Sequence, residues 1–87
     1  MITLKDLSEA VNLHDPEGLL RLGCPPDEYI DEVRRVFSNI KNSKNLTQGT
    51  LYRELREVFE SRFGGSSAST QQLLRLVSED LFDEVGE

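Results

Sequence analysis

Two residues that each occur once could form a reactive pair in this chain. His14 and Cys24 are its only histidine and its only cysteine, and a cysteine beside a histidine can act as a nucleophile with its base. The surrounding sequence has no nucleophile turn and no oxyanion motif, which such a site also requires. The simpler interpretation places His14 at a helix junction over a short helix, and Cys24 as a small apolar residue between two helices. We therefore predict that the chain is not an enzyme and has no catalytic residue.

Four closely spaced carboxylates, those of Asp27, Glu28, Asp31 and Glu32, raise the question of a metal site. Side chains three and four residues apart share a helix face, where carboxylates could bind a metal ion. Acidic residues in a first turn also complement the helix dipole, and Asp31 and Glu32 have ion-pair spacing to Arg35. The Glu-x-x-His signature of di-iron bundles is absent. We therefore predict no metal ligand and no bound cofactor.

The acidic residues of the chain concentrate near its C-terminal end. The tail 79–87 contains five of the 16 Asp and Glu residues and no Lys or Arg, so it accounts for five of the six net negative charges. A near-neutral remainder without a basic stripe indicates that the protein does not bind nucleic acid. Acids at the C-terminal end of a helix oppose its dipole, so local stability gives no reason for them. This end either frays in solvent or meets a basic partner, whose opposite charge would speed encounter.

Two apolar residues near the acidic tail favour the second of these interpretations. Leu76 and Phe82 point away from the apolar face that the other large apolar residues of the last helix share. They could pack against another helix of the same domain or against a partner protein. The predicted partner-binding surface comprises Leu76, Glu79, Asp80, Phe82, Asp83 and Glu84.

Capping residues and apolar periodicity predict the helices that position these side chains. Thr3, Thr47 and either Ser67 or Ser69 have N-cap character, and the Gly- and Ser-rich stretch 64–69 is predicted to be a flexible linker. There is no strand alternation and no internal repeat, and short loops favour antiparallel neighbours. The fold class is therefore all-α, a small bundle of four main helices plus one short connecting helix. The main helices are predicted over residues 4–13, 25–41, 48–63 and, depending on which serine is the cap, 68–85 or 70–85.

The order of helix-starting and helix-ending residues in the N-terminal half is the most specific pattern in the chain. An Asp-Pro pair caps and starts the short helix predicted over residues 16–22, one glycine allows close backbone approach, and the next glycine stops the helix. Prolines then start the following helix, and Tyr29 anchors its apolar face in the core with its hydroxyl at the rim. The structural motif comprises Asp15, Pro16, Gly18, Gly23, Pro25, Asp27 and Tyr29.

These residues resemble the YugE-like family of small bacterial helical proteins. That family has an aromatic residue followed by Asp-Pro-x-Gly, and then Gly-x-Pro-x-Asp-Glu-Tyr, and the likeness covers roughly residues 12–40. His14 stands where the family often has tryptophan, and Pro26 is an additional proline. The resemblance implies a compact all-α bacterial protein without assigned chemistry, and it implies no catalytic residue.

The length of 87 residues predicts one helical domain, 1–87, with a modest core, because a chain of this size buries only about 60 % of its unfolded surface. No apolar stretch approaches the length of a membrane span, and the first residues do not resemble a signal peptide. The lone cysteine cannot form an internal disulfide. We therefore expect a cytoplasmic protein without membrane contact.

Together these observations favour a small non-enzymatic protein-protein interaction module whose partner the sequence does not identify. An immunity-type or antitoxin-type inhibitor of a basic enzyme is the alternative, since small size and negative charge suit that role. A metal-binding protein or an enzyme that uses His14, Cys24 and the four carboxylates is a further alternative. The linker could also let the last helix swap between two subunits, which would make the protein a homodimer.

Overall fold

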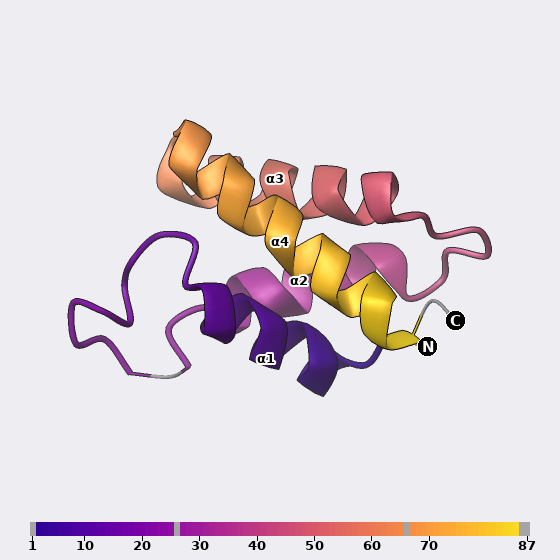
Figure 1. Ribbon diagram of the computed structural model, residues 1–87, viewed down its shortest axis with the longest axis horizontal. Coiled ribbons are helices and arrows are strands. Elements are labelled where there is room, and N and C mark those ends of the chain that lie inside the picture. Colours follow the sequence, from indigo (N-terminus) through magenta and orange to yellow (C-terminus); the bar gives the residue numbers. More distant parts are fainter. Residues whose placement is uncertain (1, 26, 66, 86–87) are drawn as a thin grey trace.

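Four α-helices make up most of the computed structural model, which describes residues 2–25, 27–65 and 67–85, the last three of these by their backbone (Figure 1). No strand occurs in these ranges, so the predicted all-α class with four main helices is confirmed. None of the helices described is long and apolar enough to cross a membrane. The helices are α1 (Leu4–His14), α2 (Ile30–Ile40), α3 (Gln48–Phe63) and α4 (Ala68–Val85).

Hydrogen-bonding side chains begin three of the helices. Thr3 forms a capping box at α1, where its hydroxyl and its backbone N–H both bond to the third residue beyond it. Thr47 accepts a backbone N–H at 3.1 Å at the start of α3. Ser67 accepts the N–H of Thr70 at 3.1 Å at the start of α4. The structure thus selects Ser67 over Ser69 as the cap of the last helix.

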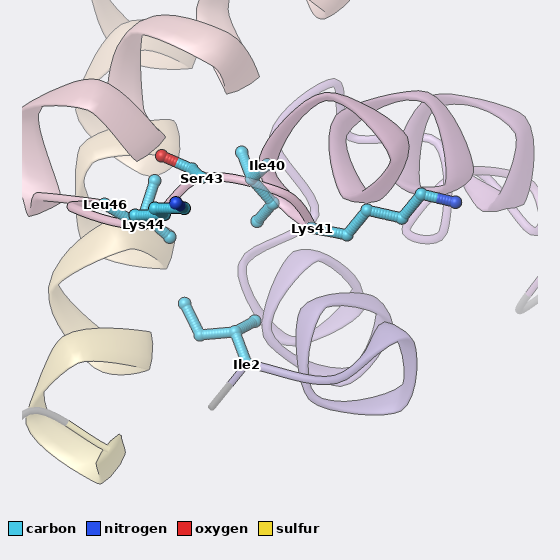
Figure 2. A pocket seen from close by; sticks show the side chains of 6 residues that line it. All are labelled: Ile2, Ile40, Lys41, Ser43, Lys44 and Leu46. Carbon is cyan, nitrogen blue, oxygen red and sulfur yellow. The ribbon is translucent and has the colours of Figure 1, made fainter.

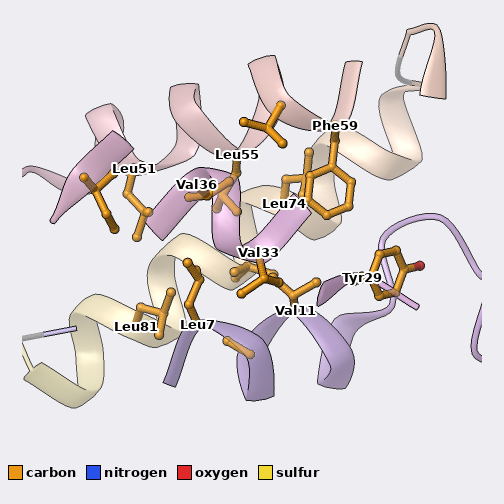
Figure 3. Packing of buried hydrophobic residues seen from close by; sticks show 14 of the residues in the cluster. Leu7, Val11, Tyr29, Val33, Val36, Leu51, Leu55, Phe59, Leu74 and Leu81 are labelled. Atoms are coloured by element: carbon orange, nitrogen blue, oxygen red, sulfur yellow. The ribbon is translucent and has the colours of Figure 1, made fainter. Parts of the chain in front are cut away.

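All four helices contribute to one hydrophobic core (Figure 3). Helix α1 packs against α2 and α4, and α3 packs against the same two helices. The ring of Phe59 lies 5.7 Å from that of Tyr29 and 5.8 Å from that of Phe63, measured between centroids. Each fully buried large aliphatic or aromatic side chain contributes about 1.5–3 kcal/mol to folding. The fully buried aliphatic residues include Leu7, Val11, Val33, Val36, Leu51, Leu55, Leu74, Val77 and Leu81.

The loop between α1 and α2 and the first described residues lie at opposite ends of the bundle (Figure 1). The loop extends from the end where α1 finishes and α2 begins, and the turn between α3 and α4 lies at the same end. The first described residues and the loop between α2 and α3 lie at the other end. The long connection of residues 15–29 is therefore the main projection at its end of the bundle.

The short helix predicted over residues 16–22 is not confirmed. The chain forms consecutive turns there, in which the Gly18 amide donates to the Asp15 carbonyl at 2.9 Å and the Cys24 amide donates to the Leu19 carbonyl at 3.1 Å. Asp15 and Gly18 have φ angles of 48° and 71°. A right-handed helix cannot run through residues in the left-handed region. Asp15 therefore ends α1 as its C-cap instead of starting a new helix.

Helix α2 begins later than the sequence pattern predicts. The expected start is at Pro25, whereas the helix begins at Ile30, with Tyr29 as its N-cap. The Glu28 amide donates to the Pro25 carbonyl at 3.0 Å, and the Ile30 amide donates to the Asp27 carbonyl at 3.1 Å. Each of these bonds spans three residues, as in a β-turn, and neither spans the four residues of an α-helical bond.

Gly49 in α3 and Gly64, the C-cap of α3, should respond to substitution by alanine in opposite directions. Gly64 ends the helix at a φ of 80°, and a Cβ there would meet no atom within 4 Å. Gly64→Ala should lower the free energy of unfolding by about 1–2 kcal/mol, because only conformational strain opposes it. Gly49 has no such φ, and its added Cβ would lie 4.0 Å from Thr47 Oγ1. Gly49→Ala should raise the stability by about 0.4–1 kcal/mol. Urea unfolding measures the free energy of unfolding of both variants. A change in the same direction for the two variants would contradict this account.

Candidate functional site

The loop of residues 15–29 contains the whole structural motif predicted from the sequence. It extends from one end of the bundle (Figure 1). Compact loops of this kind, whose shape is fixed by their own side chains, are often functional. Two buried side chains hold this loop in place, namely those of Asp15 and Tyr29.

The carboxylate of Asp15 is the centre of the hydrogen bonds within the loop. The residue is 5 % exposed. Its Oδ1 accepts the Leu20 amide at 3.1 Å and the Tyr29 hydroxyl at 2.6 Å. Its Oδ2 accepts the Arg21 amide at 3.1 Å and lies 3.9 Å from Arg21 Nε. Both oxygens of this buried carboxylate are therefore satisfied, and they fix residues 20 and 21 relative to the end of α1.

Tyr29 joins the loop to the hydrophobic core. Its ring packs on Phe59, and its hydroxyl donates to Asp15 while accepting the Glu17 amide at 3.0 Å and the Leu19 amide at 3.4 Å. Figure 3 shows the hydroxyl directed away from the other labelled core side chains. The expectation that this hydroxyl reaches the solvent rim is wrong, because Tyr29 is 1 % exposed and the backbone of the loop encloses it.

The surroundings shift the pKa values of both groups in directions that support their contact. Burial raises the pKa of Asp15, but the hydrogen bonds that it accepts and the charge of Arg21 outweigh burial, so the pKa is lowered. Burial and the hydrogen bond to Asp15 raise the pKa of the Tyr29 hydroxyl. At neutral pH Asp15 is therefore ionised and Tyr29 is protonated, which suits a bond from hydroxyl to carboxylate.

A further contact fixes the loop to α4. Thr70 Oγ1 donates to the Pro16 carbonyl at 3.1 Å, and both residues are buried. Gly23 takes a φ of 95° where the loop turns toward α2. The remaining motif residues, Pro25 and Asp27, are exposed. The loop therefore contacts all four helices, through the C-cap of α1, Tyr29 before α2 with its ring on Phe59 of α3, and Thr70 in α4.

This end of the bundle presents two leucines to solvent. Leu13, in the last turn of α1, is 74 % exposed, and Leu22, in the loop, is 79 % exposed. Leu22 directly follows the two residues whose amides bind Asp15, so buried hydrogen bonds set its position. The sequence carried one signal for Leu13, which lies off the apolar face of its helix. No signal in the sequence indicated that Leu22 is exposed, because the predicted short helix would have placed Leu22 on an apolar face with the other leucines of that segment.

Two members of the partner-binding surface predicted on α4 contact the protein itself. Asp80 Oδ2 lies 2.6 Å from His14 Nε2, which ties α4 to the last residue of α1. Phe82 is half-buried and packs against the core. The expectation that His14 packs over a short helix is corrected by the same contact, since its polar partner belongs to α4.

Two further members of that predicted surface, Leu76 and Glu79, are partly exposed. Leu76 is half-buried. Glu79 is also half-buried and lines a pocket that Arg75 shares. The side chains of Asp83 and Glu84 lie outside the described residues, so their part in a partner-binding surface stays a prediction.

The residues considered for metal binding or catalysis do not gather into one site. Within the described ranges, no three His, Cys, Asp or Glu side chains are arranged to hold a metal ion. Glu32 pairs with Arg62 of α3, with Oε2 at 2.9 Å from Nε, and the expected local pair with Arg35 is not formed. Cys24 is half-buried in the loop, whereas the polar contact of His14 is with α4.

A pocket of about 220 Å³ lies toward the opposite end of the bundle, beside the first described residues (Figure 2). Its apolar part comes from isoleucine and leucine side chains, and its polar part comes from the loop between α2 and α3. Figure 2 shows Lys41 extending away from the other side chains. The polar groups therefore do not converge on a common point, as a ligand site requires. The lining residues are Ile2, Ile40, Lys41, Ser43, Lys44 and Leu46.

Comparison of the chain with family models, with curated proteins and with solved structures finds no match. The resemblance to the YugE-like family over roughly residues 12–40 stays a prediction from the sequence. The case for a function therefore depends on the geometry of the loop and of the surfaces beside it.

Removal of one hydroxyl should measure how firmly the loop is held. Tyr29→Phe keeps the ring in the core but removes one of the two donors to Asp15 Oδ1 and leaves the Glu17 amide without its acceptor. We expect the free energy of unfolding to fall by about 1–3 kcal/mol, because unpaired polar groups would stay buried. Tyr52→Phe, at a half-buried tyrosine of α3, is the matched control and should change stability by less than about 0.5 kcal/mol. Similar losses in the two variants would contradict the assigned contact.

The lowered pKa of Asp15 predicts an acid-dependent contribution to stability. A carboxyl whose folded pKa lies below its unfolded value stabilises the protein above the unfolded pKa, near 3.8, and loses this effect as the pH falls through the folded pKa. Asp15→Asn should therefore destabilise the protein at neutral pH, and the difference from wild type should shrink below pH 3.8. Burial raises the pKa of Glu17, which means that its charged form is disfavoured in the folded protein. Glu17→Gln should therefore stabilise the protein at neutral pH. Urea unfolding across pH tests this, and a constant difference for Asp15→Asn would refute it.

Proposed function

We propose that this chain is a non-enzymatic protein-binding module whose contact surface is the loop end of the bundle, with Leu13 and Leu22 at its centre. The observation that carries the proposal is the 79 % exposure of Leu22 on a loop that a buried carboxylate and a buried tyrosine hold in one shape. Leu13, 74 % exposed, adds a second apolar side chain at the same end.

Burial of these leucines by a partner supplies a driving force for association. Transfer of one leucine side chain from water to an apolar environment is worth about 1.5–3 kcal/mol. Binding normally loses part of such a gain to the ordering of flexible segments. The contacts of Asp15, Tyr29 and Thr70 order this loop in advance, so that less of the gain is lost.

The chemistry around the leucines indicates the kind of partner. Arg21, Pro25 and Glu28 are exposed in the same loop and supply both signs of charge and an apolar ring. Protein interfaces combine an apolar centre with a polar rim in this way. The partner is therefore expected to be a protein with an apolar recess and a mixed-charge border. We keep the cytoplasmic location expected from the sequence as part of the proposal, since a free thiol such as Cys24 stays reduced there.

Substitution of the two leucines should remove the partner without harming the fold. In affinity capture from an extract of the source cells, wild type should retain a stoichiometric partner that the double variant Leu13→Ser, Leu22→Ser binds at least about tenfold more weakly. Gln72→Ser, at an exposed position of α4, is the control and should bind as wild type does. Circular dichroism should show the same helix content in all three proteins.

The salt dependence of the same complex separates this proposal from its alternatives. A contact through the loop leucines should persist at raised salt, because apolar burial is not screened. A contact through the acidic tail, as in an inhibitor of a basic enzyme, should weaken. The proposal fails when the double variant retains the same partner with the affinity of wild type, or when the complex dissolves with salt.

A further inference from the structure

The two ends of the bundle carry apolar features of opposite shape. At the loop end, Leu22 is exposed on a loop that buried hydrogen bonds hold in place. At the other end, the pocket of about 220 Å³ is lined by the half-buried Leu46 and by the buried Ile2 and Ile40 (Figure 2). One chain therefore displays both an apolar projection and an apolar recess, and the two lie at opposite ends (Figure 1).

The pocket suits a side chain of another protein better than it suits a small ligand. A small ligand needs polar groups that converge on it, and those of this pocket do not. A projecting leucine needs only apolar walls, and the volume of the pocket exceeds that of one leucine side chain. The hydrocarbon stems of Lys41 and Lys44 extend these walls, because a lysine stem can cover apolar surface while its charge stays in water.

The loop presents negative charge beside its exposed leucine. Asp27 and Glu28 are exposed, and neither forms an ion pair with another described residue. Arg21 is the one basic residue of the loop, and its Nε lies 3.9 Å from the Asp15 carboxylate, which offsets part of its charge. The charge that the loop offers to a partner is therefore mainly acidic.

The rim of the pocket presents the opposite charge. Lys41 and Lys44 are exposed, and within the described part of the chain neither of them forms an ion pair. Figure 2 shows Lys41 extending outward from the rim, where it would meet a surface that approaches the pocket. Opposite charges around an apolar contact speed the encounter of two proteins and fix their orientation. The rim therefore suits an acidic loop.

We propose that the loop end binds a second copy of this chain, with Leu22 in the pocket at the opposite end of that copy and the acids of the loop against the lysines of the rim. This inference rests on the proposed function, because it uses the same contact surface and names its partner. Each copy donates its leucine at one end and receives another at the other end. The contact is therefore heterologous, and copies add head to tail instead of stopping at a dimer.

Light scattering of the purified full chain at increasing concentration tests this assembly. The average mass should rise with concentration beyond that of two copies. Leu22→Ser and Lys44→Glu should each weaken the association at least about tenfold. Arg53→Glu, at an exposed position of α3 outside the pocket, is the control for the charge change and should associate as wild type does. All three positions are exposed, so circular dichroism should show the same helix content in every variant.

An equimolar mixture of the two weakened variants tests the direction of the contact. Leu22→Ser keeps an intact pocket, and Lys44→Glu keeps an intact leucine, so one productive contact remains possible in each mixed pair. We expect dimers in the mixture and single copies of each variant alone. A mixture that stays monomeric overturns the proposal, as does a wild-type mass that stops at two copies.

The outcome is separable from that of the proposed function. A wild-type chain that stays a single copy up to about 1 mM overturns the head-to-tail contact, even when capture from an extract still depends on the leucines. Self-association that Leu22→Ser leaves unchanged overturns it as well. The proposed function itself fails only through the capture experiment, in which the partner comes from the extract.

Discussion

The hydrogen bond between the Asp15 carboxylate and the Tyr29 hydroxyl is the contact on which the loop end of the molecule depends. A carboxylate leaves water at a large cost in free energy unless donors replace the water. Here the hydroxyl and two backbone amides replace it, and the ring of Tyr29 packs on Phe59 in the core. The shape of a fifteen-residue connection is thereby tied to the packing of the bundle, and the positions of the exposed leucines follow from it.

Local sequence rules predicted the parts of the fold that local forces determine. Thr3 and Thr47 cap their helices as expected, because a cap involves only atoms within a turn of the chain. The same rules did not predict the loop correctly, because its Asp-Pro pair and its glycines also match the start and the end of a short helix. The choice between turn and helix is decided by Tyr29, fourteen residues from Asp15, whose hydroxyl is available only in the folded chain.

The candidate sites escaped prediction for the same reason. Asp80, which the sequence places on a predicted surface for partners, also contacts His14, which lies 66 residues earlier in the chain. Glu32 has suitable spacing to Arg35 on its own helix, yet it pairs with Arg62 of α3. A pair that spans two packed helices and is partly shielded from water interacts more strongly than an exposed pair on one helix. The spacing of residues along a sequence reveals only the ion pairs within one helix, which are the weaker of the two kinds.

The two most buried carboxylates of the described chain, those of Asp15 and Glu32, are satisfied to different degrees. Asp15 has donors on both oxygens, and every donor belongs to the segment that it holds in place. Its geometry is complete without another molecule. Glu32 is buried to the same degree but has a partner on one oxygen only, at the wall of a pocket with further charged groups. Donors from the chain itself satisfy both oxygens of the first carboxylate, whereas the second carboxylate is held to α3 through one oxygen only.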